Sequence, residues 1–208
     1  MSEMHSDFMK KTVSWNKLHL KNICINNMEK EYKKIDLDYI NKHYKTPEGF
    51  EEDYEKNHIF EMSDDATYID EKICREHIVC MRDKYGRPKF GAIGGGYSRR
   101  FYLRADGGYD IIAKCDGCGK TINLTKLIDK ITDDERTTDE YKKAVEKNRD
   151  YRRYSMNEIE YLRYKVFCDE RHGDMISIGW MGTGLGWIIN VRDEDTAEYA
   201  DITDIDCW

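Results

Sequence analysis

Two cysteines in the sequence have the spacing of metal ligands. Cys115 and Cys118 form a C-x2-C motif in the segment CDGCG, whose glycines favour a tight turn. Two thiolates at this spacing can hold one zinc ion, and a structural zinc site needs two further ligands. The sequence offers a C-x3-H pair and two upstream residues for those positions: Cys168, His172, Cys80 and His77. The motif leaves two predictions open, a zinc ion or no cofactor.

A basic and aromatic segment could bind nucleic acid or an acidic protein. Residues 82 to 104 contain seven Lys or Arg residues and one acid, although the whole chain has a net charge of -7. Cations that pair with phosphates alternate there with rings that stack on bases. The predicted binding residues are Lys89, Tyr97, Arg99, Arg100, Tyr102 and Arg104. Because side chains alternate along a strand, Arg99 and Arg100 are not expected on one face.

An acidic segment follows near the end of the sequence. Residues 193 to 206 contain seven acids and no Lys or Arg. Such a run is either a solvated edge or a surface that docks on the basic groove of a nucleic-acid-binding protein. In the second case the predicted contacts are Asp193, Glu194, Asp195 and Glu198.

The motifs of common enzymes are not found. The glycine cluster GAIGGG, residues 91 to 96, leads into a strand-like SRRFYLR, without the Lys-Ser/Thr or G-x-G-x-x-G of phosphate loops. We therefore interpret it as a bend in the backbone. There is no G-x-S-x-G or H-E-x-x-H motif. The sequence favours a protein that is not an enzyme, with nucleic-acid processing as the alternative.

Glycine turns and periodic apolar residues predict the elements that carry these motifs. Residues 1–62 are expected to form short helices, and residues 129–154 a charged helical linker. Residues 63–128 and 155–208 each read as a helix followed by an antiparallel three-stranded meander. The predicted fold is α+β, with both meanders joined in one sheet and the helices on one face. Two separate small modules are the disfavoured alternative.

The two predicted units align with each other at a constant offset of 78 residues. The aligned pairs are Gly108 with Gly186, Tyr109 with Trp187, Ile111 with Ile189, Leu124 with Ile202 and Thr125 with Thr203. Upstream, a larger offset aligns Cys80 with Cys168, which would make both small core residues. The second unit has Asp193 and Thr196 in place of Cys115 and Cys118. The repeat therefore argues against zinc.

The sequence contains no apolar run long enough to span a bilayer and no apolar secretory signal. Its seven cysteines are scattered and odd in number, which is typical of reduced thiols. We therefore expect a cytoplasmic protein without a membrane partner.

One stretch resembles a known group of proteins. DKYGRPKFGAIGGG, Asp83 to Gly96, together with the later Asp201-Ile202-Thr203-Asp204 and Trp208, resembles small accessory proteins of phages and mobile elements in Gram-positive bacteria. Some proteins with similar GRPKFGAIGGG modules look like anti-CRISPR factors. The resemblance implies a bacterial host cell and an inhibitor of a host nucleic-acid-handling protein, such as a CRISPR effector, or of its guide RNA. The alternatives are a direct RNA- or DNA-binding protein and a structural zinc-binding interaction module.

Overall fold

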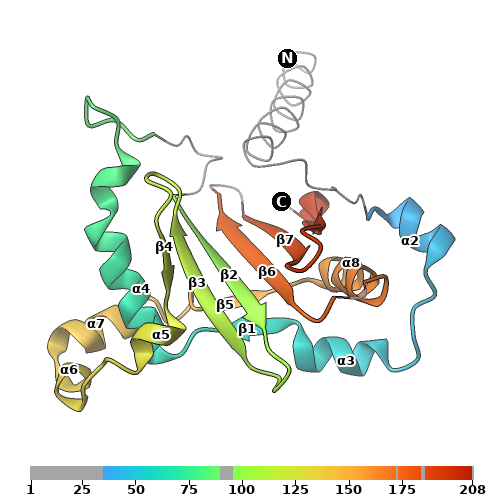
Figure 1. Ribbon diagram of the computed structural model, residues 1–208, viewed down its shortest axis with the longest axis horizontal. Helices are drawn as coiled ribbons and strands as arrows, with labels where there is room; N and C mark the ends of the chain where they lie inside the picture. The colour runs from blue at the N-terminus through green and yellow to red at the C-terminus, as the bar shows by residue number, and fades with distance from the viewer. Residues whose placement is uncertain (1–34, 90–95, 172, 184–185, 208) are drawn as a thin grey trace, which may run out of the picture. The chain divides into compact units, whose positions relative to one another are not determined.

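Two antiparallel meanders build one six-stranded sheet (Figure 1). The first consists of β2 (Tyr97–Leu103), β3 (Tyr109–Cys115) and β4 (Thr121–Asn123). The second consists of β6 (Ile176–Gly182), β7 (Trp187–Asp193) and β8 (Tyr199–Asp201). The strand order is β4-β3-β2-β6-β7-β8, so β2 and β6 join the meanders. The computed structural model describes residues 35–89, 96–171, 173–183 and 186–207, and the predicted α+β fold is confirmed.

The two meanders have the same pattern of hydrogen bonds as well as the same order of strands. In the first, the carbonyl of Ile111 accepts from the backbone N–H of Leu124 at 2.8 Å, and its own N–H donates to Oγ1 of Thr125 at 2.9 Å. In the second, Ile189 makes the same two bonds, at 3.0 and 2.9 Å, with the residues aligned to that pair. The 78-residue offset therefore describes a real structural duplication.

The core lies on one face of the sheet. Inward-facing strand residues alternate with polar ones and are buried: Phe101, Ile111, Ile178, Trp180, Ile189 and Val191. Two helices supply apolar side chains to the same cluster, namely α4 (Asp64–Glu76) and α8 (Glu158–Asp169). Ser63 caps α4, and a capping box of Asn157 with Glu160 starts α8. Both helices thus cover one face, as predicted.

The other elements surround this core. In the first predicted region, α2 (Leu37–His43) and α3 (Phe50–Asn57) are helical, while residues 1–34 lie outside the described residues. The segment 129–154 contains α6 (Asp133–Thr137) and α7 (Asp139–Lys147), and β5 (Arg153–Ser155) begins at its end. β5 pairs with β1 (Ile59–Glu61), which the sequence did not predict. The short α5 (Thr125–Ile128) follows β4, and η2 (Ile205–Cys207) follows β8. None of the described helices is long and apolar enough to cross a membrane.

One predicted helix is wrong at its end. The apolar residues Cys74, Ile78 and Met81 have the spacing of one buried helical face, which predicts a single helix that Gly86 and Pro88 end, but α4 stops at Glu76 and His77 caps it. A separate 3-10 helix, η1 (Ile78–Met81), follows, in which Ile78 is 57 % exposed. Its supposed counterpart in the second unit, Val166, is fully buried inside α8. The upstream alignment of Cys80 with Cys168 therefore joins residues from different elements, and the argument against zinc built on it fails.

Candidate metal centre

Four side chains with metal-binding atoms converge between η1 and the turn after β3. They are His77, Cys80, Cys115 and Cys118, which we call the metal cluster, and their ligand atoms all lie within 4.8 Å of one another. The Sγ of Cys118 is 3.3 Å from Nδ1 of His77, and the Sγ of Cys80 is 3.6 Å from the same nitrogen. Among the described residues this is the one such group of three or more His, Cys, Asp or Glu side chains.

The change from α4 to η1 positions the first two ligands. The N–H of His77 donates to the carbonyl of Ile73, which closes the last turn of α4. The N–H of Cys80 then donates to the carbonyl of His77 at 2.9 Å, which closes the tighter turn of η1. The H-x2-C spacing thereby brings imidazole and thiol to the same side.

A tight turn between β3 and β4 positions the other two ligands. The N–H of Gly119 donates to the carbonyl of Cys115 at 2.7 Å, and the N–H of Cys115 donates to the carbonyl of Lys120 at 2.9 Å. Gly119 has a φ of 77°, which glycine adopts without strain. The turn lifts Cys118 towards His77, while Cys115 stays buried at the end of β3.

The donor set fits zinc. One imidazole nitrogen and three thiolates make a Cys3His set, common in tetrahedral structural sites, where sulfur atoms lie about 3.8 Å apart. The backbone N–H of Lys120 lowers the pKa of Cys118 to about 7, which favours the thiolate that a metal binds. Burial and the neighbouring thiol of Cys118 raise the pKa of Cys80. A divalent cation would relieve the repulsion between crowded thiolates.

Glycine at position 117 is required by the closeness of η1. A Cβ atom placed on Gly117 would lie 2.3 Å from the carbonyl oxygen of Cys80, which is closer than any real contact. We expect Gly117→Ala to push the turn away from η1 at a cost of about 1–3 kcal/mol, weakening zinc binding by roughly 5- to 150-fold. Competition with a chromophoric chelator measures this affinity.

Gly107→Ala is the matched control for this prediction. Gly107 has a φ of 81° in the β2–β3 turn, and a Cβ there would meet nothing within 4 Å. The variant carries backbone strain without touching the metal cluster, so its zinc affinity should equal that of the native chain. Equal affinities for Gly117→Ala and the native chain would contradict the close approach of turn and η1.

Cys168 of the predicted C-x3-H pair does not belong to this cluster. Cys168 lies in α8, where burial raises the pKa of its thiol to about 12, and His172 lies outside the described residues. The two predicted thiols Cys115 and Cys118 are instead joined by His77 and Cys80. The sequence had offered both as upstream ligands, but their H-x2-C spacing, which mirrors the C-x2-C motif, was not used because the apolar pattern placed them inside one buried helix.

The basic segment is divided between the two faces of the sheet, as strand alternation predicted. Arg99 pairs with Asp70 of α4 on the covered face, where its guanidinium donates to both carboxylate oxygens at 3.1 and 2.6 Å. Arg100 donates to Ser177 at 2.8 Å and also to Asn190 on the opposite face. Burial lowers the pKa of Arg100. Both guanidinium groups therefore serve contacts within the fold.

The other predicted residues of this segment have different surroundings, and the ring centroid of Tyr97 lies 5.6 Å from Cζ of Arg99. The hydroxyl of Tyr97 donates to the carbonyl of Cys74 at 2.7 Å, and Tyr102 is half-buried beside Arg100. Arg104 pairs with Asp106 at 3.2 Å in the β2–β3 turn. Lys89 is exposed, and residues 90–95 of the glycine cluster lie outside the described residues. Tyr97 and Arg104 therefore also make contacts within the fold.

The acidic segment stabilises its own turn. Asp193 is fully buried and accepts from the N–H groups of Asp195 and Thr196 at 2.9 and 3.1 Å. Glu194 accepts from the hydroxyl of Ser177. Asp195 accepts from two backbone N–H groups that precede β6, and Glu198 pairs with Arg171. These four predicted docking residues therefore make contacts within the second meander and with the residues between α8 and β6.

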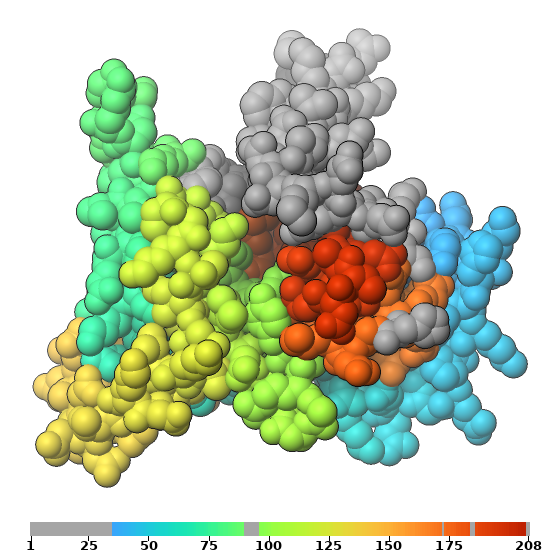
Figure 2. All heavy atoms as spheres, in the orientation of Figure 1, coloured from blue at the N-terminus to red at the C-terminus, as the bar shows by residue number. Residues whose placement is uncertain are grey.

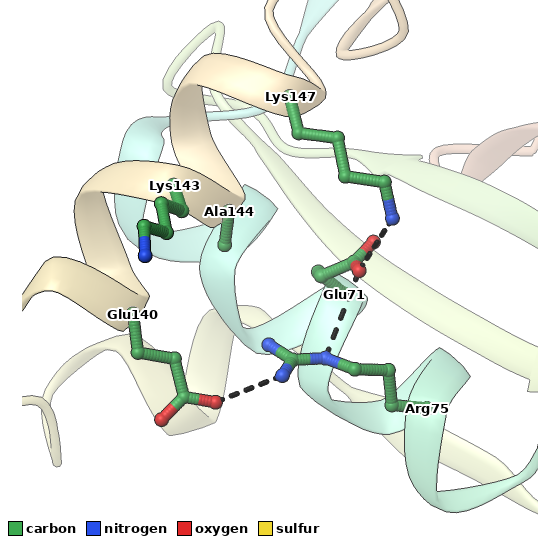
Figure 3. Close-up of a pocket in the computed structure, with 6 residues that line it drawn as sticks. All are labelled: Glu71, Arg75, Glu140, Lys143, Ala144 and Lys147. Carbon is green, nitrogen blue, oxygen red and sulfur yellow. Dashed lines mark hydrogen bonds and ion pairs between the residues drawn. The ribbon is translucent and has the colours of Figure 1, made fainter.

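A pocket of about 380 Å³ lies between α4 and α7. Figure 3 shows Glu71 at its centre, with Lys147 on one side at 2.8 Å and Arg75 on the other at 3.6 Å. Arg75 also pairs with Glu140 at 2.9 Å. These charges neutralise one another and hold α7 on α4, so the pocket has the features of a helix interface and not of a catalytic site.

No protein-family model matches the chain, and no curated protein or solved structure shows significant similarity to it.

Proposed function

We propose that this protein is a zinc-stabilised binding protein without enzymatic activity, in which the metal cluster holds one structural zinc ion. The observation that carries the proposal is the convergence of four ligand atoms within 4.8 Å. The ligands come from two segments that are far apart in sequence, the end of α4 with η1 and the β3–β4 turn. One ion would fasten these segments together.

The second copy of the meander supports a structural role. There the turn after β7 is also fastened to the residues that follow its helix, but by charge. Arg171, just after α8, pairs with Glu198. Burial opposes ionisation of Asp193, but the N–H groups of the turn, helped by the charge of Arg171, lower the pKa of its carboxyl group overall. A guanidinium would thus do in the second copy what a zinc ion does in the first. Both link a helix end to the turn of a meander.

The completeness of the donor set favours a structural ion over a catalytic one. Catalytic zinc sites keep one coordination position for water or substrate, whereas four protein ligands fill a tetrahedral site. A protein of this kind acts through the surfaces that the metal holds in place.

Metal analysis of the purified chain tests this proposal. We expect one zinc per native chain, and a loss of most of it in Cys115→Ser and Cys118→Ser, because three remaining ligands hold the ion much more weakly. Cys168→Ala is the matched control, since it removes a partly buried thiol outside the metal cluster and should keep one zinc. A native chain prepared with zinc in the buffer that retains none would contradict the proposal.

The anti-defence function remains a prediction from the resemblance of residues 83 to 96. It concerns the partner that such a binding protein would have in a bacterial host. Recovery of a host nucleic-acid-handling protein with the tagged, zinc-loaded chain would support it. Recovery of only unrelated proteins would count against it.

A further inference from the structure

A hydrogen-bonded hairpin leaves the metal cluster and projects beyond the end of α4 (Figures 1 and 2). Arg82 and Pro88 form a β-bridge, and the N–H of Asp83 donates to the carbonyl of Arg87 at 2.8 Å. The N–H of Gly86 closes the turn on the carbonyl of Asp83 at 2.9 Å, with Gly86 in the left-handed region at a φ of 78°. We call residues 82–89 the hairpin tip.

The hairpin tip is fastened to the metal cluster at its base. Its first residue follows Cys80 by only two positions. On the other strand, Nζ of Lys89 donates to the carbonyl of Gly117 at 3.4 Å, inside the turn that carries Cys115 and Cys118. Zinc at the cluster would therefore fix the direction in which the hairpin tip points.

The hairpin tip concentrates positive charge on an acidic protein. It has four basic residues and one acid, while the whole chain has a net charge of -7. Asp83 is occupied by the N–H groups of Tyr85 and Arg87 and by the Arg87 guanidinium. Within the part of the chain that the structure describes, no carboxylate lies within ion-pair distance of the other three cations, Arg82, Lys84 and Lys89.

An exposed aromatic ring lies among these cations. Tyr85 is 69 % exposed at the end of the hairpin tip. Nζ of Lys84 lies 4.9 Å and Cζ of Arg87 5.1 Å from the ring centroid. Ile78 and Val79, which are 57 % and 70 % exposed on η1, add apolar surface near the base. Cations beside an open ring match a phosphate next to a base, because each nucleotide presents both.

We propose that the hairpin tip binds single-stranded nucleic acid, with Lys84 and the other two cations that lack a carboxylate partner on phosphates and Tyr85 stacked on a base. A single strand is favoured over a duplex because its bases expose the faces that a tyrosine ring needs. It is favoured over an acidic peptide because a peptide carboxylate uses the cations and leaves the ring without a partner. The acidic remainder of the surface repels a phosphate backbone and so confines it to the hairpin tip.

This inference rests on the proposed zinc centre for the position of the hairpin tip. The test uses the full chain, loaded with zinc, and fluorescence anisotropy of labelled 20-nucleotide oligo-dT and oligo-U. We expect binding at low salt that weakens with a log–log slope of roughly -2 to -3, as expected for three or four phosphate contacts on a single strand. An unlabelled duplex of the same length and an oligo-glutamate peptide serve as competitors and should compete poorly.

Charge and stacking are separated by two variants with matched controls. Lys84→Glu with Arg82→Glu should weaken binding at least tenfold, whereas Lys142→Glu with Lys143→Glu, an equal charge change at exposed positions of α7, should change it less than twofold. Tyr85→Ala should weaken binding at least about fivefold. Tyr151→Ala, which removes a ring that is also 69 % exposed, should leave it unchanged.

Zinc content, measured on every sample, separates the two proposals. Loss of binding in the hairpin-tip variants with one zinc per chain retained supports the inference. Binding that depends on Lys84 and Tyr85 in a chain without zinc also supports it, and contradicts only the zinc centre. The inference is overturned if the zinc-loaded chain binds neither oligonucleotide at low salt, or if each hairpin-tip variant has the same affinity as its matched control. It is also overturned if the duplex or the peptide competes as well as the single strand.

Discussion

Removal of zinc with a chelator is expected to lower the thermal midpoint of this protein by roughly 8–16 °C. Zinc that binds only the folded chain stabilises it by about 4 kcal/mol when free zinc exceeds its dissociation constant a thousandfold. In a chain of this size each kcal/mol corresponds to about 2–4 °C. Circular dichroism during heating, with zinc and with a chelator, measures the difference.

The loss should be local, because the main core does not depend on the ion. Phe101, Trp180 and Val191 are fully buried at the centre of the sheet, well supported by α4 and α8. The apo chain should therefore keep its sheet signal at 25 °C and become protease-sensitive around residues 77–89, next to the metal cluster. Cys118→Ser should show the lowered midpoint already, with no further drop on chelation. An unchanged midpoint after complete zinc removal would contradict a structural role.

The meanders could be predicted from the sequence because their signals are local. Asp106-Gly107-Gly108 gives a turn with Gly107 at a φ of 81°, and alternating residues on either side give the strands. The Leu/Ile-Thr pair occurs once in each meander, and its threonine accepts the same backbone hydrogen bond, from Ile111 in the first and from Ile189 in the second. The short β1–β5 pair could not be predicted in this way, because it joins three-residue strands from distant parts of the chain.

The metal cluster was only half visible in the sequence. The spacing of the C-x2-C motif indicates metal ligands, whereas His77 and Cys80 lie among apolar residues that continue the helical period of α4. The exposed fraction of the side chains distinguishes a continued helix from a separate turn, since Val79 is 70 % exposed and so does not continue the buried face of α4. Exposure depends on tertiary packing, which periodicity alone does not determine. The same limit applies to Arg99, whose charge suggested a surface but whose partner is Asp70.

Breaking the Arg99–Asp70 pair is expected to destabilise the fold by about 3–5 kcal/mol, because it leaves a buried cation without its counter-ion. The two side chains are only 12 % and 11 % exposed, and the guanidinium bonds both carboxylate oxygens. Burial opposes the charged form of Arg99, but the carboxylate of Asp70 outweighs it and the pKa of Arg99 is raised. Asp70→Ala removes that carboxylate, and urea unfolding measures the change in the free energy of unfolding.

A double variant distinguishes an unpaired charge from lost packing. If the cost arises from the stranded cation, Asp70→Leu with Arg99→Met should recover most of the stability, because apolar side chains of similar size can replace a buried ion pair. Glu52→Ala, which breaks the exposed Lys56–Glu52 pair on α3, should have little effect and serves as the control. If Asp70→Ala costs no more than Glu52→Ala, Arg99 does not need its partner and its charge is free for a ligand. If the predicted loss and its recovery are both observed, Arg99 is a structural residue that joins α4 to β2, and nucleic-acid binding has to be sought at the hairpin tip.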